Sequence, residues 1–136
     1  MRFVLDASVA IAWCFEAGET EAADQALAAF LTGGTAVVPS LWRLEVANVL
    51  LVAERRGRST PAETTRCLSL LDGLPITVMA DGNGIADHVA VARSHGLTAY
   101  DAAYLDLAMR EGLPLATLDR ELAAAARAAG VGLLGA

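Results

Sequence analysis

Residues 2–8 read RFVLDAS, a short apolar run that ends at Asp6 and leads into a helical pattern. Similar short runs recur along the chain and alternate with longer segments that have the apolar spacing of helices. We expect strands at Arg2–Leu5, Ala36–Val38, Ile76–Met79, Leu115–Thr117 and Val131–Leu134. We expect helices at Ser8–Glu16, Glu21–Leu31, Leu41–Arg56, Pro61–Leu71, Gly84–His95, Ala99–Glu111 and Arg120–Ala129. This alternation predicts an α/β fold, with a mostly parallel sheet and helices on both of its faces.

The expected helix ends carry capping signals that agree with this assignment. Thr60-Pro61-Ala62-Glu63 is a capping box with proline at the first helical position, and Thr98-Ala99-Tyr100-Asp101 is a second box. A glycine, which tolerates the left-handed backbone of a helix end, follows four of the helices: Gly57, Gly96, Gly112 and Gly130. No repeat or linker interrupts the pattern, so residues 1–136 are expected to form one domain.

The composition narrows the possible functions. Hydrophobic residues make up 55% of the chain, which excludes a disordered protein. All ten basic residues are arginine, and this excludes mechanisms that need a lysine, such as Walker A phosphate binding or Schiff-base chemistry. The net charge of −6 disfavours nonspecific electrostatic binding to nucleic acid and favours a basic partner or bound cations.

The cysteines and the lack of a membrane segment predict the cellular location. Cys14 and Cys67 have neither metal-ligand spacing nor a disulfide framework, so we interpret them as unpaired cysteines of an intracellular protein. Asp6 interrupts the first apolar residues too early for the core of a signal peptide. The longest charge-free run, residues 25–42, contains glycines and a proline and cannot span a bilayer as one apolar helix. We therefore expect a cytoplasmic protein without membrane contact.

Four carboxylates stand in four separate segments. Asp6 and Asp119 follow expected strands, and Asp101 lies in the first turn of an expected helix. Glu45 lies in a helix that is apolar almost all round and is therefore expected to be buried. Ligands of parallel sheets gather beyond the carboxyl ends of the strands. If the strand before Asp119 lies beside the first strand, Asp6 and Asp119 are neighbours at that edge.

Each acid also has a purely structural interpretation, and the residues alone leave both open. Asp6 and Asp119 are suitable helix N-caps, and Asp101 is a suitable capping-box acid. Glu45 is harder to explain in this way, because a buried carboxylate costs several kcal/mol unless it is paired or binds a metal. An arginine partner or a solvent-facing edge of the helix would satisfy it. Asn48 shares the face of Glu45 and adds a neutral polar group.

A cluster of carboxylates in one pocket favours a divalent cation. Oxygen ligands without histidine or cysteine select hard ions, Mg²⁺ or Mn²⁺, and the matching chemistry is metal-assisted phosphodiester hydrolysis. Ser8 and Thr117 are placed to bond the acids, metal-bound waters or a phosphate; the alternative is that Ser8 caps the first helix and Thr117 simply fits a strand. A phosphatase with Asp6 as nucleophile is disfavoured, because Ser8 stands where a second aspartate is needed and lysine is absent. Dinucleotide binding is excluded because no G-x-G-x-x-G follows the first strand.

Taken in order, four short motifs resemble the PIN domain family, and within it the VapC-type toxins of bacterial toxin–antitoxin pairs. The motifs are Asp6-Ala7-Ser8, Glu45-Val46-Ala47-Asn48, the stretch from Thr98 to Tyr104, and Thr117-Leu118-Asp119. The resemblance covers the whole chain. It implies a Rossmann-like PIN fold with a five-stranded sheet in the order 3-2-1-4-5.

The same resemblance carries expectations about function. It implies a Mg²⁺- or Mn²⁺-dependent endoribonuclease in which Asp6, Glu45, Asp101 and Asp119 form the acidic, metal-binding and catalytic pocket. It implies an RNA substrate, a homodimer, and inhibition by a cognate VapB-type antitoxin whose basic tail enters the groove. The alternative is a catalytically silent binding module on the same fold. Because a silent copy has no reason to keep four acids that repel each other, the nuclease is the favoured interpretation.

Overall fold

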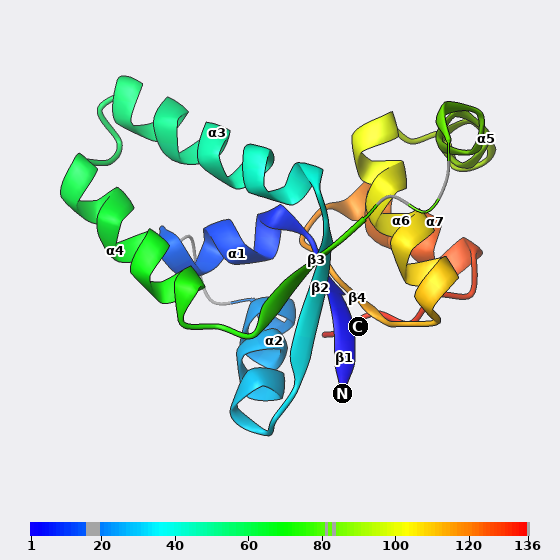
Figure 1. Cartoon of the computed structure of the whole chain (residues 1–136), viewed down its shortest axis with the longest axis horizontal. Coiled ribbons are helices and arrows are strands. Elements are labelled where there is room, and N and C mark those ends of the chain that lie inside the picture. Colours follow the sequence, from blue (N-terminus) through cyan, green and yellow to red (C-terminus); the bar gives the residue numbers. More distant parts are fainter. Residues whose placement is uncertain (16–19, 81, 83, 136) are drawn as a thin grey trace.

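The first strand, β1 (Arg2–Leu5), lies in the middle of a parallel sheet (Figure 1). The structure is a computed structural model that describes residues 1–15, 20–80, 82 and 84–135. Strand β2 (Thr35–Pro39) pairs with one side of β1, and β4 (Leu115–Ala116) pairs with the other. Strand β3 (Ile76–Met79) pairs with the outer side of β2, which gives the order β3-β2-β1-β4. The parallel strands place the chain segments after β1 and β4 at the same edge of the sheet.

Helices cover both faces of this sheet, as the sequence predicted. They are α1 (Ala7–Cys14), α2 (Glu21–Leu31), α3 (Leu41–Arg55), α4 (Pro61–Asp72), α5 (Ile85–His95), α6 (Ala99–Glu111) and α7 (Arg120–Ala128). Figure 1 shows α1 to α4 on one side of the sheet and α5 to α7 on the other. The observed ends lie within one or two residues of the expected ones; Glu16 lies outside the described residues. Within the described residues, no helix has the length and apolar character needed to cross a membrane.

The expected fifth strand is not formed, so the described part of the sheet has four strands rather than five. Residues 131–134 make a single parallel bridge between Leu133 and Leu115. Two backbone bonds accompany it, from the Leu115 N–H to Gly132 O at 2.9 Å and from the Leu134 N–H to Leu115 O at 3.0 Å. The two residues of β4 offer only a short ladder, and the flanking glycines weaken strand formation. The segment thus occupies the fifth position without becoming a strand.

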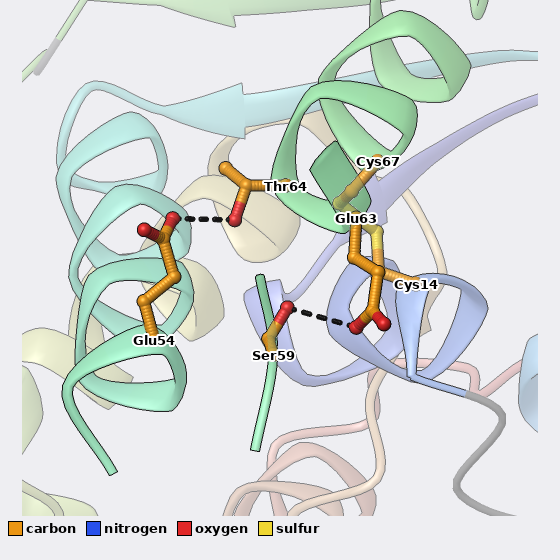
Figure 2. The surroundings of a disulfide bond; sticks show 6 residues. All are labelled: Cys14, Glu54, Ser59, Glu63, Thr64 and Cys67. Atoms are coloured by element: carbon orange, nitrogen blue, oxygen red, sulfur yellow. Dashed lines mark hydrogen bonds between the residues drawn. A yellow bond between two sulfur atoms is a disulfide. The ribbon is translucent and has the colours of Figure 1, made fainter. Parts of the chain in front are cut away.

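The prediction of two unpaired cysteines is wrong, because Cys14 and Cys67 form a disulfide (Figure 2). The two residues are 53 positions apart in the sequence, and their Cα atoms are 5.2 Å apart in the fold. Helices α3 and α4 form a hairpin, residues 41–72, that folds back onto α1 and brings the middle of α4 to the end of α1. The sequence around either cysteine does not predict this pairing. One of the grounds for the intracellular interpretation is thereby removed.

Helix α3 is also less buried than predicted. Trp42, Val46 and Leu50 face the interior, whereas Leu44 on the opposite side is 75% exposed. The helix leaves the sheet after β2 and packs one face on α1 (Figure 1). Its outer apolar residues therefore remain in solvent. Glu45 is consequently half-buried at the border between the two sides rather than enclosed.

Candidate functional site

Asp6 is the most deeply buried of the four acids. It follows β1 and is the N-cap residue of α1, where its side chain makes no capping bond. It is 6% exposed. Its Oδ2 atom accepts hydrogen bonds from the Ser8 and Thr117 hydroxyls, both at 2.7 Å. Because α1 starts at Ala7, Ser8 does not cap the helix but holds the carboxylate in place.

The same hydroxyls join the end of β4 to the end of β1. The Leu118 N–H donates to Ser8 Oγ at 3.0 Å, and the Asp119 N–H donates to Thr117 Oγ1 at 3.0 Å. Asp119 in turn caps α7, since its Oδ1 accepts from the Leu122 N–H at 2.9 Å. The capping interpretation of Asp119 is therefore confirmed, and the cap places its carboxylate near Asp6. The structural interpretation holds for this residue, and its part in a metal-binding or catalytic pocket stays a prediction.

Glu45 is held by a residue for which the sequence suggested no role. The Tyr104 hydroxyl donates to Glu45 Oε1 across 59 positions of sequence. Tyr104 is fully buried in α6, and the pKa of its phenol is raised by burial and by the carboxylate it bonds, so it acts as a donor. Its spacing was a signal: Tyr104 stands three residues after Asp101 and so shares a helix face with that acid.

Asp101 lies in the first turn of α6 and is partly buried. Its backbone N–H donates to the Thr98 side chain at 3.1 Å, as the capping box predicted. This cap leaves the carboxylate itself available for other contacts. Glu121, in the first turn of α7, adds a further negative charge that raises the pKa of Asp101. Glu121 was not singled out from the sequence.

The fold places the four acids close enough for their charges to interact. Burial raises the pKa of the Asp6 carboxyl, and the charge of Asp119 raises it further against the two hydroxyl bonds. Burial also raises the pKa of Glu45, with added repulsion from Asp6 and Asp101. The pKa of Asp101 is raised by burial and then by Asp119 and Asp6. At neutral pH the folded protein therefore holds these negative charges at an energetic cost.

The chemistry of the donor set suits a hard divalent cation. Among the described residues, none of these four acids takes part in a salt bridge. The ion pair found in this part of the chain joins Arg110 to Asp106. No three acidic, histidine or cysteine side chains of the described residues are arranged to grip one ion together. Mg²⁺ does not need such a cage, because it keeps several waters and is usually bound through one or two carboxylates. The carboxylate oxygens and uncompensated charge fit that mode of binding.

Asn48 lies apart from this cluster. It is exposed on α3 and lines a separate pocket with Phe15, Val52 and Arg56, and none of the four acids lines that pocket. Asn48 and Glu45 are one turn apart on α3, and Glu45 bonds Tyr104 whereas Asn48 lines this other pocket. A role for Asn48 at the acids stays a prediction.

Comparison with known proteins agrees with the fold and with the motifs. The family model of the PIN domain matches residues 3–128. This chain belongs to the PIN domain family. The matched range contains all of β1 except Arg2, and it contains all four acids of the cluster.

Two proteins of Pyrobaculum aerophilum are similar over most of the chain. Ribonuclease VapC3 of Pyrobaculum aerophilum is 35% identical over 125 residues, which cover 90% of this chain and 93% of that protein. The crystal structure of PAE2754 from the same organism superposes with a TM-score of 0.74 at 28% identity, covering 98% of this chain and 84% of that one. The resemblance to VapC-type members is thereby confirmed.

A more distant structure shares the fold. A toxin–antitoxin complex from Klebsiella pneumoniae matches with a TM-score of 0.54 and 21% identity, over 83% of this chain and 82% of that chain. At this identity the match supports the PIN fold and carries nothing about residues or partners.

The raised pKa values give a first test of the cluster. A carboxyl whose pKa is raised stabilises the folded state below its unfolded pKa, and this contribution is lost as the pH rises through the folded value. In EDTA at pH 7, Asp101→Asn is therefore expected to be more stable than the wild type by at most about 1 kcal/mol, because Asp101 is partly exposed and screened. The gain should shrink as the pH falls towards 4, which chemical denaturation at several pH values measures.

Asp87→Asn is the matched control, since Asp87 holds the same position in the first turn of α5 and is exposed. That variant loses the favourable interaction with the helix dipole without relief of any cluster repulsion. An Asp101→Asn protein that is no more stable than Asp87→Asn at pH 7 would show that the acids are ordinary caps.

Proposed function

We propose that this PIN domain is a Mg²⁺- or Mn²⁺-dependent endoribonuclease and acts as the toxin of a toxin–antitoxin pair. The observation that carries the proposal is the meeting of Asp6, Glu45, Asp101 and Asp119, three of them with raised pKa values, without a neutralising arginine among the described residues. The name of the relative, Ribonuclease VapC3, supports the same activity.

The chain's own residues have distinct tasks in this proposal. Asp6, Glu45, Asp101 and Asp119 supply the metal ligands directly or through water. Ser8 and Thr117 fix the orientation of the Asp6 carboxylate, and Tyr104 fixes Glu45. A metal ion bound there supplies a water of lowered pKa and positive charge against the phosphate. Fixed ligand orientation matters because such supporting bonds typically contribute about 10–100-fold to metal affinity or activity.

The silent binding module is the weaker alternative. Buried and mutually repelling carboxylates lower the stability of the folded protein at neutral pH. A module that only binds a partner gains nothing from this cost. A binding module would also have no need of the hydroxyls that hold the acids. Each of these hydroxyls donates a hydrogen bond to an acid of the cluster: those of Ser8, Thr117 and Tyr104.

The partners are part of the proposal. The net charge of −6 and the acid cluster favour a basic segment, so we propose a VapB-type antitoxin whose arginine or lysine side chains approach the acids. RNA is the proposed substrate. The proposed oligomeric state is a homodimer, and the proposed location is the cytoplasm, without membrane contact.

Incubation with a panel of RNAs tests the function. Structured and single-stranded RNAs are incubated with the protein in Mg²⁺ and in Mn²⁺, beside DNAs of the same sequences. We expect internal cleavage of at least one RNA, with its DNA copy left intact. Intact RNA throughout the panel at excess protein, in both metals, would refute the nuclease, and equal cleavage by an Asp6→Asn preparation would reveal a contaminant.

A further inference from the structure

Helix α4 has little holding it to the rest of the protein. Of its twelve residues, all of which the structure describes, Cys67 and Leu71 are the buried ones. Apolar side chains on its other faces remain in solvent, with Leu68 46% and Leu70 41% exposed. Helices with so few buried apolar contacts open at low free-energy cost. The attachment of α4 therefore depends on the burial of Leu71, on the Cys67 side chain and on polar contacts such as that of Thr64.

Cys67 forms the covalent link between α4 and α1. Its partner Cys14 is the last residue of α1, the helix that begins directly after Asp6 and carries Ser8. Figure 2 shows the disulfide beside the bond from the Thr64 hydroxyl to Glu54, 2.6 Å long, which ties α4 to α3. This bond links α4 to α3, and the disulfide links α4 to the helix behind Asp6.

Helix α4 also borders the residues of α3 that flank Glu45 in the sequence. Leu68 and Leu71 line a groove of about 350 Å³ together with Trp42 and Val46, which stand on either side of Glu45 in α3. The Nε1 atom of Trp42 is buried there without a hydrogen-bond partner among the described residues. The two helices are incompletely packed at this point, so their contact alone fastens α4 weakly.

Cys67 is buried, and the partly exposed Cys14 makes the disulfide accessible to reagents from one side. Both cysteines line a pocket of about 410 Å³, which Arg58, Arg66 and Glu63 also line. Glu63 accepts a hydrogen bond from the Ser59 hydroxyl at 3.2 Å. Two arginines and one glutamate give this pocket a net positive charge, which favours a departing thiolate.

We propose that the Cys14–Cys67 disulfide is a redox-controlled clamp that holds the α3–α4 hairpin, and with it Glu45, in register with Asp6. The part of this inference that concerns RNA cleavage rests on the proposed function. The reductant is a dithiol. Its thiolate attacks one cysteine sulfur, the S–S bond breaks, and the electron pair leaves on the other cysteine, which takes a proton from water. The second thiol of the reagent then releases the first cysteine, so that the protein gains two electrons and two protons and the dithiol becomes a cyclic disulfide.

Hydrogen exchange and RNA cleavage, measured on the same samples, test the clamp. Full-length protein is prepared oxidised, reduced with dithiothreitol, and reoxidised, with alkylation and mass spectrometry to count free thiols. Reduction is expected to speed amide exchange in residues 61–72 by at least about tenfold and to leave β1 unchanged. RNA cleavage in Mg²⁺ is expected to fall by at least about threefold, since small misplacements of catalytic groups are costly. Reoxidation should reverse both effects.

The Cys14→Ser/Cys67→Ser protein is the control for direct effects of the reagent. It should match the reduced wild type and should not respond to dithiothreitol. Should the serines impair folding, wild-type protein that has been reduced, alkylated and separated from dithiothreitol serves in its place. Equal exchange of residues 61–72 in the oxidised and reduced proteins would overturn the clamp, and equal cleavage would overturn its control of the site. An oxidised protein that cuts no RNA refutes the nuclease, while the exchange data still decide whether the hairpin is clamped.

Discussion

Replacement of Asp6 by asparagine is expected to lower RNA cleavage by at least about 1000-fold while the fold persists. Asp6 is the buried acid whose charge acts on both Glu45 and Asp101, so its loss alters the whole cluster. The asparagine side-chain oxygen can still accept the bonds that Ser8 and Thr117 donate to Asp6. The change therefore removes the charge and keeps the local structure.

Single-turnover cleavage of an RNA that the wild type cuts measures this effect. Circular dichroism and a melting curve in EDTA show whether the fold is retained, and we expect the variant to melt no lower than the wild type. Asp87→Asn, which changes an exposed acid of α5 in the same way, should cleave at the wild-type rate. Cleavage by Asp6→Asn within about tenfold of the wild type would contradict a catalytic role for the cluster.

Removal of divalent metal is the second change with a large expected effect. EDTA should reduce RNA cleavage to the level without protein, and Mg²⁺ or Mn²⁺ in excess should restore it. The same ions should stabilise the folded protein, because a ligand that binds only the native state raises the free energy of unfolding by about 2.7 kcal/mol at 100 times its Kd. For a domain of this size that corresponds to a rise in Tm of roughly 5–10 °C.

Melting curves with and without Mg²⁺ measure the binding apart from activity. The wild type should gain stability with Mg²⁺, Asp87→Asn should gain as much, and Asp6→Asn should gain much less. The difference in Tm between Asp6→Asn and the wild type should therefore become smaller, or change sign, when EDTA is replaced by Mg²⁺. Cleavage that continues in EDTA, or a wild-type Tm that is the same with and without Mg²⁺, would count against a metal site at these acids.

The sequence by itself determined the elements and the position of the acids along them. Apolar spacing and capping residues are local, and the observed helices end within one or two residues of the expected ones for that reason. Asp6 and Asp119 could be placed at one edge because each follows a strand and parallel strands end together. The hydroxyl partners Ser8 and Thr117 could also be predicted from the sequence, since each stands two residues from an acid.

Only the tertiary structure decided the contacts between distant segments. The bond from Tyr104 to Glu45 spans 59 positions, and the disulfide spans 53. The exposure of α3 followed from the way the hairpin leaves the sheet, and the last segment stayed a single bridge because β4 is short. Burial and pairing depend on what the fold brings opposite a residue, and the spacing of side chains along one helix or strand contains no information about that.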